Sequence, residues 1–281
     1  MAYKLSRALT CAFLVASTVG CAKRQAVVGS GNSADTVRVV VYNMHAGKDA
    51  AGVDNLQRIV DFVRDVRADV VLLQEVDQGT RRSGGVDQPA VLAARSGFHV
   101  AFGSALDYDG GEYGVATLSR WPITFDTLYR LPVDPPQERA GGSREPRGML
   151  RAEIVSPYGG LVVFNTHIDA SREDTWRRQE AGVIVATVTT ARATRPLVLL
   201  GGDMNSTPES AVQEMVRGAG LRDAFSECGQ GAGLTFPSDS AVKRIDYLYL
   251  TGVVRCARAE VAATRVSDHR PLVVDVLLPR P

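Results

Sequence analysis

The stretch VRVVVYNMH at residues 37–45 decides the fold, because LVVFNTH at residues 161–167 repeats its pattern. Each stretch is an apolar run typical of a buried strand, and each run ends in Asn-x-His. A helix-like segment and a second apolar run follow, and the second run leads into an acid, Glu75 in LLQE and Asp203 in LLGGD. The repeat predicts two related strand–helix–strand halves, and each half delivers polar residues at the carboxyl ends of its strands.

Segments around these halves continue the alternation. Apolar residues recur at helical spacing over residues 56–66, a second helix is expected over residues 176–190, and a short one near residues 209–217. Further strands are expected over residues 115–118, 149–155, 245–250 and 272–277. Mixed strands with interleaved helices predict an α/β sandwich, in which two sheets pack face to face with helices outside. No linker divides residues 36–281, so we expect one domain, with a long surface loop over residues 130–147.

The N-terminus differs from the rest of the chain. Lys4 and Arg7 precede a mostly apolar stretch that ends at Cys21, so residues 1–20 are expected to be an export signal. Small residues before the cysteine resemble a bacterial lipoprotein signal, in which Cys21 is lipidated; a plain signal peptide with an incidental cysteine is the alternative. Residues 21–35 are polar and aperiodic and are expected to be a tether. We therefore expect an exported, lipid-anchored protein of the bacterial cell envelope, periplasmic or at the outer surface.

Composition and charge limit the possible partners. Of the 281 residues, 45% are hydrophobic and 22% charged, an ordinary globular mixture that excludes a disordered chain or a disulfide-dense miniprotein. Loss of residues 1–20 would remove two of the 32 Lys+Arg and none of the 31 Asp+Glu, which leaves the two signs almost balanced. Such a balance gives no electrostatic footprint for nonspecific binding to DNA, although a local patch could still bind it. In an exported protein, Cys228 and Cys256 are expected to form a disulfide.

Polar side chains at the strand ends point to one site. Burying them unpaired is expensive, so a core strand gains nothing from ending in them unless they act together. Four of these residues, Asn43, Glu75, Asp203 and Asn205, offer carboxylate or amide oxygens and no thiolate. Oxygen ligands of this kind suit Mg²⁺ or Mn²⁺ better than Zn²⁺. The pair Asp268-His269 lies near the end of the chain, and we expect it to belong to the same site as His167 and Asp246. These groups supply a histidine near neutral pKa and a carboxylate able to hold its tautomer, as general-base catalysis requires.

Seven short motifs in this order resemble the motif set of the endonuclease/exonuclease/phosphatase superfamily. They are Asn43 in VYNMH, Gln74-Glu75, Tyr113-Gly114 with Leu118-Ser119-Arg120, Thr166-His167, Gly202-Asp203-Met204-Asn205, Arg244-Ile245-Asp246-Tyr247 and Ser267-Asp268-His269-Arg270-Pro271. The resemblance extends over about residues 37–278. It implies a four-layer α/β sandwich of the DNase I-like type and Mg²⁺-dependent cleavage of a phosphate ester.

The resemblance also implies roles for the metal-binding and catalytic residues. Glu75 would be the principal metal ligand, assisted by Asn43 and Asp268. His269 would act as general base, and Asp246 would orient it.

Another part of the motif set would handle the phosphate. Asp203 and Asn205 would position the attacking water or the phosphate, His167 would contact the phosphate, and Tyr113 would hydrogen-bond near it. An arginine in the loop before the fifth strand would also approach the phosphate, with Arg147 favoured over Arg144. The acidic and aromatic residues 107–112 are either a lip of the substrate site or a solvated turn. His45 either faces the cleft or makes a structural hydrogen bond.

The residues in and around the motifs are similar to those of an exported bacterial branch of the superfamily near the calcofluor-white-hypersensitive proteins. The similar segments are residues 43–49, 74–88 and 102–114. The carboxyl-terminal domain of those proteins works on glycosylphosphatidylinositol-anchor lipids, which favours a lipid headgroup over nucleic acid as substrate. We therefore expect a monomeric Mg²⁺- or Mn²⁺-dependent phosphodiesterase acting on a phospholipid- or sphingolipid-type envelope ester. The alternatives are a secreted Mg²⁺-dependent nuclease and a non-catalytic surface binding protein with the same fold.

Overall fold

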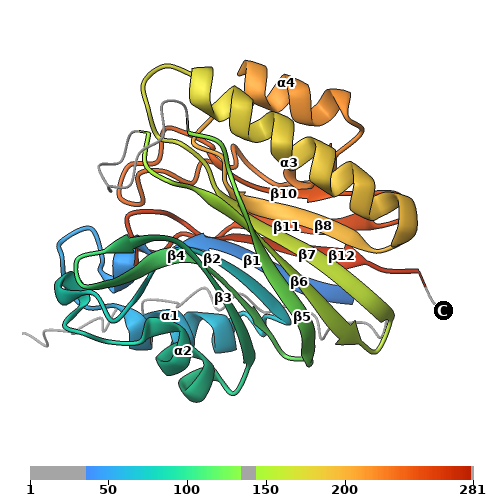
Figure 1. Ribbon diagram of the computed structural model, residues 1–281. Helices are drawn as coiled ribbons and strands as arrows, with labels where there is room; N and C mark the ends of the chain where they lie inside the picture. The colour runs from blue at the N-terminus through green and yellow to red at the C-terminus, as the bar shows by residue number, and fades with distance from the viewer. Residues whose placement is uncertain (1–35, 134–143, 280–281) are drawn as a thin grey trace, which may run out of the picture. The chain divides into compact units, whose positions relative to one another are not determined.

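The computed structural model describes residues 36–133 and 144–279, and in this part of the chain two six-stranded sheets pack face to face (Figure 1). The first sheet runs in the order β11 (Arg255–Val261), β12 (Leu272–Leu277), β1 (Thr36–Asn43), β2 (Val70–Gln78), β4 (Gly111–Ser119) and β3 (His99–Tyr108). The second runs in the order β5 (Ile123–Arg130), β6 (Gly148–Ser156), β7 (Gly159–His167), β8 (Val198–Asp203), β10 (Asp246–Leu250) and β9 (Arg222–Asp223). The expected α/β sandwich is confirmed.

Helices cover the two outer faces and complete four layers. They are α1 (Leu56–Asp65), α2 (Gln88–Ser96), α3 (Thr175–Thr194), α4 (Ala211–Gly218) and the short α5 (Ala224–Cys228), with single turns at η1 (His45–Gly47) and η2 (Arg81–Ser83). Figure 1 shows α1 and α2 on the outside of the first sheet and α3 and α4 on the outside of the second. Among the described residues, none of the helices is both long enough and apolar enough to cross a membrane.

The predicted pair of strand–helix–strand halves lies at the centre of the sandwich. β1 pairs with β2 in parallel across α1, and β7 pairs with β8 in parallel across α3. Every other strand pairing is antiparallel within the residues described. Parallel strands carry their carboxyl ends to the same edge, so Asn43 lies beside Gln74 and His167 beside Asp203.

Burial on both faces explains why the central strands are continuous apolar runs. In β1, Val39 and Val41 pack into the cluster between the two sheets, whereas Val40 and Tyr42 pack with the residues of α1. On the other side of the molecule, Phe164 of β7 packs with the apolar stripe of α3, which includes Ile184. The two sheets therefore share one core, and each has a second core beneath its helices.

Several expectations are corrected or lie outside the described residues. The edge strands β3, β5, β9 and β11 and the helices α2 and α5 are present although the apolar pattern did not predict them. Residues 130–147 were expected to be a surface loop, but Glu145 and Arg147 are 4% and 3% exposed, because they pair with each other at the site described below. The export signal, Cys21 and the tether lie outside the described residues. Cys228 and Cys256 form the expected disulfide, which links α5 to β11.

Candidate active site

A cavity of about 710 Å³ opens where the carboxyl ends of the central parallel strands meet. Most of the residues predicted for the site line it: Glu75, Tyr113, Arg147, His167, Asp203, Asn205, Asp268 and His269. Asn43 and Asp246 are almost fully buried and do not line the cavity. Asn43 hydrogen-bonds the lining residue Glu75, and Asp246 hydrogen-bonds the lining residue His269. The structure therefore brings together residues that are as far apart in the sequence as Asn43 and His269.

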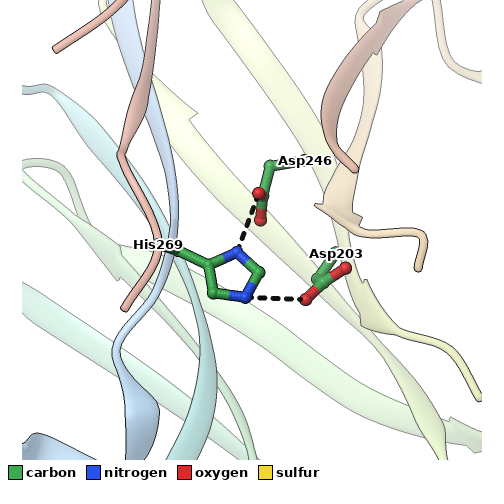
Figure 2. Close-up of side chains that lie close together, drawn as sticks. All are labelled: Asp203, Asp246 and His269. Atoms are coloured by element: carbon green, nitrogen blue, oxygen red, sulfur yellow. Dashed lines mark hydrogen bonds and ion pairs between the residues drawn. The ribbon is translucent and has the colours of Figure 1, made fainter. Parts of the chain in front are cut away.

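The imidazole of His269 lies between two carboxylates (Figure 2). Its Nδ1 is 2.9 Å from Asp246 Oδ2, and its Nε2 is 3.6 Å from Asp203 Oδ2. Burial favours the neutral ring, but Asp246 and then Asp203 outweigh it and raise the pKa of His269 to about 10. The hydrogen bond to the buried Asp246 fixes the ring orientation and leaves Nε2 on the side of the cavity.

Asp203 is positioned by the glycines that precede it. A Cβ on Gly202 would lie 1.9 Å from the main-chain oxygen of Thr166, so only glycine lets β8 approach β7 this closely. The Asp203 carboxylate accepts hydrogen bonds from the Asn43 side chain at 3.1 Å and from the Asn205 main-chain N–H at 2.9 Å. Burial and the neighbouring Asp246 raise the pKa of Asp203 to about 7. Asp203 Oδ2 and His269 Nε2, which are 3.6 Å apart, are therefore both able to bind a proton at this point of the cavity.

Glu75 reaches the cavity because β2 is interrupted. The pairing of β2 with β4 shifts register between Leu73 and Val76, and Glu75 has a φ of 55° within this bulge. A bulge redirects a side chain, and here it directs Glu75 toward Asn43, whose Nδ2 donates to Glu75 Oε1 at 3.0 Å. Asn43 Oδ1 accepts from the main-chain N–H of His45, so the Asn43 amide joins Glu75 and Asp203 as a hydrogen-bond donor.

The donor chemistry fits a divalent cation. The carboxylates of Glu75, Asp203 and Asp268 line the cavity, Asp246 lies behind them, and Asp246 Oδ1 is buried with no hydrogen-bond partner among the described residues. Excess buried negative charge of this kind is usually balanced by a metal ion, and oxygen ligands suit a hard one.

Two groups of these residues could hold such an ion. Ligand atoms of Asp203, Asp246 and His269 lie within 4.8 Å of one another, but there the imidazole is already hydrogen-bonded to Asp246. Glu75 and Asp268 face the cavity without that constraint. Assignment of the metal to Glu75, Asn43 and Asp268 therefore stays a prediction.

Arg147, His167 and Asn205, which were predicted to bind the phosphate, lie next to one another at the cavity. Arg147 Nη1 is 2.9 Å from His167 Nδ1, and His167 Nε2 is 3.1 Å from Asn205 Nδ2. Burial, then Arg147 and His269, hold the pKa of His167 well below its usual value. Because arginine can only donate, the neutral ring accepts at Nδ1 and carries its proton on Nε2. The Asn205 amide nitrogen also only donates, so its approach to Nε2 is a contact between two donors, and its hydrogen bond goes to the main-chain oxygen of Ile168 at 2.9 Å. The group therefore presents donors to an anion.

Arg144 and Tyr113 can also be placed. The Arg144 guanidinium lies 4.3 Å from the ring centroid of Trp176 and does not line the cavity, whereas Arg147 does. Burial, then the charge of Glu75, raise the pKa of Tyr113 well above its usual value, so its phenol stays a proton donor.

A sequence profile described as the Endonuclease/Exonuclease/phosphatase family matches residues 40–269. The chain belongs to this family. Family members are hydrolases that act on phosphate esters. The fold and the family resemblance stated from the sequence are thus confirmed.

Relatives of this family member differ in how much of their length they share with it. The uncharacterized protein YbhP of Escherichia coli (strain K12) is 26% identical over 252 residues, which cover 86% of this chain and 96% of YbhP. Protein cwh43 of Schizosaccharomyces pombe is 25% identical over 231 residues, which cover 81% of this chain but only 21% of cwh43.

Solved structures of the family share the architecture. An endonuclease/exonuclease/phosphatase from Beutenbergia cavernae has a TM-score of 0.75 at 23% identity, with 87% of this chain and 72% of that chain covered. The mannosyl-6-phosphatase Bt3783 of Bacteroides thetaiotaomicron has a TM-score of 0.73 at 18% identity, with 86% of this chain and 99% of that chain covered.

Some lining residues of this family member were not predicted. They are Arg82, Ser171, Arg172, Arg177, Thr207, Phe236 and Lys243. Tyr108 makes the 107–112 segment a lip of the cavity, with its turn at Asp109-Gly110. The signal for Arg82 and Arg177 was weak, because an arginine in a sequence gives no indication of which cavity it will line. The ring of His45 does not line the cavity, but its Nδ1 lies 3.9 Å from Oδ1 of the lining residue Asp268 and has no hydrogen-bond partner among the described residues.

Proposed function

We propose that the chain is a divalent-metal-dependent phosphodiesterase that hydrolyses a phosphate ester of the bacterial envelope, with a phospholipid- or sphingolipid-type headgroup favoured over nucleic acid. The observation that carries the proposal is the Asp246–His269 pair, at 2.9 Å, facing Asp203 in a cavity that also contains Arg147 and His167. The Asp246–His269 pair can accept a proton, and Arg147 and His167 can bind an anion.

His269 would take the proton from the attacking water. Its Nε2 and Asp203 Oδ2 are 3.6 Å apart, so one water can contact both atoms. Asp246 stabilises the imidazolium that forms, because its carboxylate is buried and already bonded to Nδ1. The proton lost by water therefore has a defined acceptor.

Charge on the phosphate would be stabilised by Arg147, His167 and Asn205; Arg147 holds His167, and the main-chain oxygen of Ile168 holds Asn205, before substrate binds. Glu75 and Asp268 would hold a Mg²⁺ or Mn²⁺ ion, with Asn43 fixing Glu75. When bound, such an ion supplies positive charge that stabilises the phosphate oxygens and lowers the pKa of the neighbouring imidazole toward neutrality.

Three features support an envelope substrate. The sequence resembles a lipid-remodelling branch of the family, the two signs of charge are almost balanced, and the chain begins like a lipoprotein precursor. The Cys228–Cys256 disulfide fits an oxidising compartment such as the periplasm. A lipid anchor at Cys21 would keep the domain, as a monomer, beside its substrate.

The test is a substrate panel with the purified chain and Mg²⁺ or Mn²⁺. Bis-nitrophenyl phosphate, sphingomyelin, phosphatidylinositol, other phospholipids, plasmid and single-stranded DNA are compared side by side. We expect metal-dependent cleavage of the chromogenic diester and of at least one lipid. DNA cleavage far faster than lipid cleavage would instead identify a nuclease. No cleavage and no metal-dependent thermal shift would identify a binding protein.

A further inference from the structure

The basic residues of the cavity differ in whether they already have a counterion. Its cationic lining residues are Arg82, Arg147, Arg172, Arg177 and Lys243. Arg82 is paired with Asp77 at 2.7 Å, and Arg147 with Glu145 at 2.7 Å. No described carboxylate forms an ion pair with Arg172, Arg177 or Lys243. Lys243 is exposed, whereas Arg172 and Arg177 lie together in the segment between β7 and the first turn of α3.

Arg177 is buried, with 8% of its surface exposed. Its Nη1 donates to the main-chain oxygens of Asp169 and Ser171, and its Nε is buried without a partner among the described residues. Glu180, an acid on the same helix, accepts instead from the main-chain N–H of Asp169. A buried guanidinium without a counterion is costly, so the molecule keeps a positive charge at the cavity wall that an anion would stabilise.

Ser171 and Arg172 stand next to that charge. The Ser171 hydroxyl is buried, lines the cavity and has no hydrogen-bond partner in the part of the chain described. Arg172 lines the same cavity with an exposed side chain. A buried hydroxyl, a buried guanidinium and an exposed guanidinium therefore converge on one wall, all of them able to donate to an anion.

The aromatic side chains that line the cavity do not form a binding site for a cationic headgroup. A quaternary ammonium group is usually held over open faces of aromatic rings. Here the guanidinium of Arg82 lies 4.5 Å from the centroid of Tyr108 and 5.2 Å from that of Tyr113. The ring of Phe236 packs against His269 at 4.8 Å between centroids. These rings are already in contact with other groups, so a choline-type headgroup has no aromatic cage among them.

We propose that Ser171, Arg172 and Arg177 form a second anion subsite. The substrate then carries a second negatively charged group, on the headgroup that is attached to the scissile phosphate. The chemical class is a phosphate ester whose headgroup bears a carboxylate, sulfate or phosphate. This inference rests on the proposed function only in placing the scissile phosphate at Arg147, His167 and Asn205.

Calorimetry with three non-hydrolysable probes tests it. The full chain with Mg²⁺ is titrated with propylphosphonate whose terminal carbon is bare, sulfonated or trimethylammonium-substituted. We expect the sulfonated probe to bind about tenfold more tightly than the bare probe, as a charge-assisted contact implies, and the ammonium probe to bind no better than the bare one. Equal affinities, tighter binding of the ammonium probe, or no binding of any probe would each overturn the subsite.

Variants separate recognition from a structural role of the same residues. Ser171→Ala with Arg172→Ala removes two donors without touching the main-chain contacts of Arg177, and should reduce the sulfonate preference to below about threefold. Arg178→Ala is the matched control, because Arg178 is on the same helix, pairs with Asp174 and does not line the cavity. A preference that survives in the double variant, or that is lost equally in the control, contradicts the proposal.

Arg177 is tested by charge rather than by deletion. Arg177→Lys keeps the positive charge and should keep most of the preference, whereas Arg177→Met should lose it; thermal melting shows whether each variant is folded. A methionine variant that melts like the parent and keeps the preference contradicts the assignment. Because binding is measured without turnover, a chain that prefers the sulfonate but cleaves nothing would disprove the proposed hydrolysis and leave the subsite standing.

Discussion

Individual residues of the site depend on unusual main-chain positions. Glu75 takes a φ of 55° at a bulge, and Asn205 takes a φ of 42° two residues after the end of β8. Non-glycine residues adopt such conformations rarely, and they persist where the surrounding structure determines them, often at functional sites. Here both residues contribute side chains to the same cavity, which ties the local geometry to the proposed chemistry.

Replacement of the proposed ligand or base should remove turnover. In Glu75→Gln the carboxylate charge is lost, and in His269→Asn the proton acceptor is lost, so the rate on bis-nitrophenyl phosphate should fall about 10²- to 10⁴-fold in each. The melting temperature should stay close to that of the parent. His99→Asn, at the exposed start of β3, is the control. Rates within threefold of the parent would show that the assigned roles are wrong.

Gly202 should tolerate no side chain. Gly202→Ala would place a Cβ 1.9 Å from the Thr166 oxygen, at a φ of 149° that other residues rarely adopt. The free energy of unfolding should fall by about 3 kcal/mol, measured by urea denaturation. Gly182→Ala, within α3 and with open space around its Cβ, should instead gain up to about 1 kcal/mol. If both variants unfold alike, the close approach of β7 and β8 is not what requires glycine.

At the scale of elements, the apolar pattern predicted the strands that are covered on both sides. All eight central strands were expected, whereas the missed β3, β5, β9 and β11 are the four edge strands of the two sheets. An edge strand such as β5 is half-exposed, so it has no continuous apolar run to detect. α2 was missed because few of its apolar residues are buried, although Asp87, which caps it, and Pro89 mark its start.

The same distinction applies to the candidate site. Strand-end residues such as Asn43 and Asp203 could be found because polar groups interrupt an apolar run. Arg82 and Arg177 could not, because whether an arginine reaches the cavity depends on distant segments that the sequence does not bring together. The choice between Arg147 and Arg144 also depended on packing, since both stand in the same loop and only the structure shows which one contacts His167.

Helix α3 contains a buried acid whose titration should be visible in stability. Burial raises the pKa of Glu180 from 4.5 to about 8, so the folded state holds a proton that the unfolded chain releases. The stabilisation is fully present below pH 4.5 and is lost as the pH rises through 8. Between pH 5.5 and 8.5 the parent should lose on the order of 2–3 kcal/mol more than Glu180→Gln in urea denaturation.

A matched substitution controls for the loss of an acid. Glu214→Gln, on the exposed face of α4, should follow the parent across the same pH range. If Glu180→Gln also follows the parent, Glu180 is ionised in the folded protein, and its burial is balanced by Arg147 and Arg177 rather than by a proton.

At the scale of the whole molecule, the chain combines a symmetric framework with an asymmetric cavity. The two parallel pairs occupy equivalent places in their sheets, yet one delivers Asn43 and Glu75 and the other His167 and Asp203. Acids surround His269, whereas the segment after β7 adds arginines. A substrate that is anionic at both the scissile phosphate and the headgroup would match this distribution.

The proposed lipid anchor gives the last prediction, because it changes access to a lipid without changing the site. Attachment at Cys21 would confine the domain to the membrane surface and raise the effective concentration of any lipid substrate. Cys21→Ser should therefore move the chain from the membrane fraction to the soluble fraction of cells. It should also slow cleavage of lipid in vesicles at least about tenfold relative to anchored protein in the same vesicles. Hydrolysis of soluble bis-nitrophenyl phosphate by the two forms should be equal, since the site is intact in both. A variant that remains membrane-bound would contradict the anchor. A released variant that cleaves vesicle lipid as fast as the parent would contradict the idea that anchoring serves a lipid substrate.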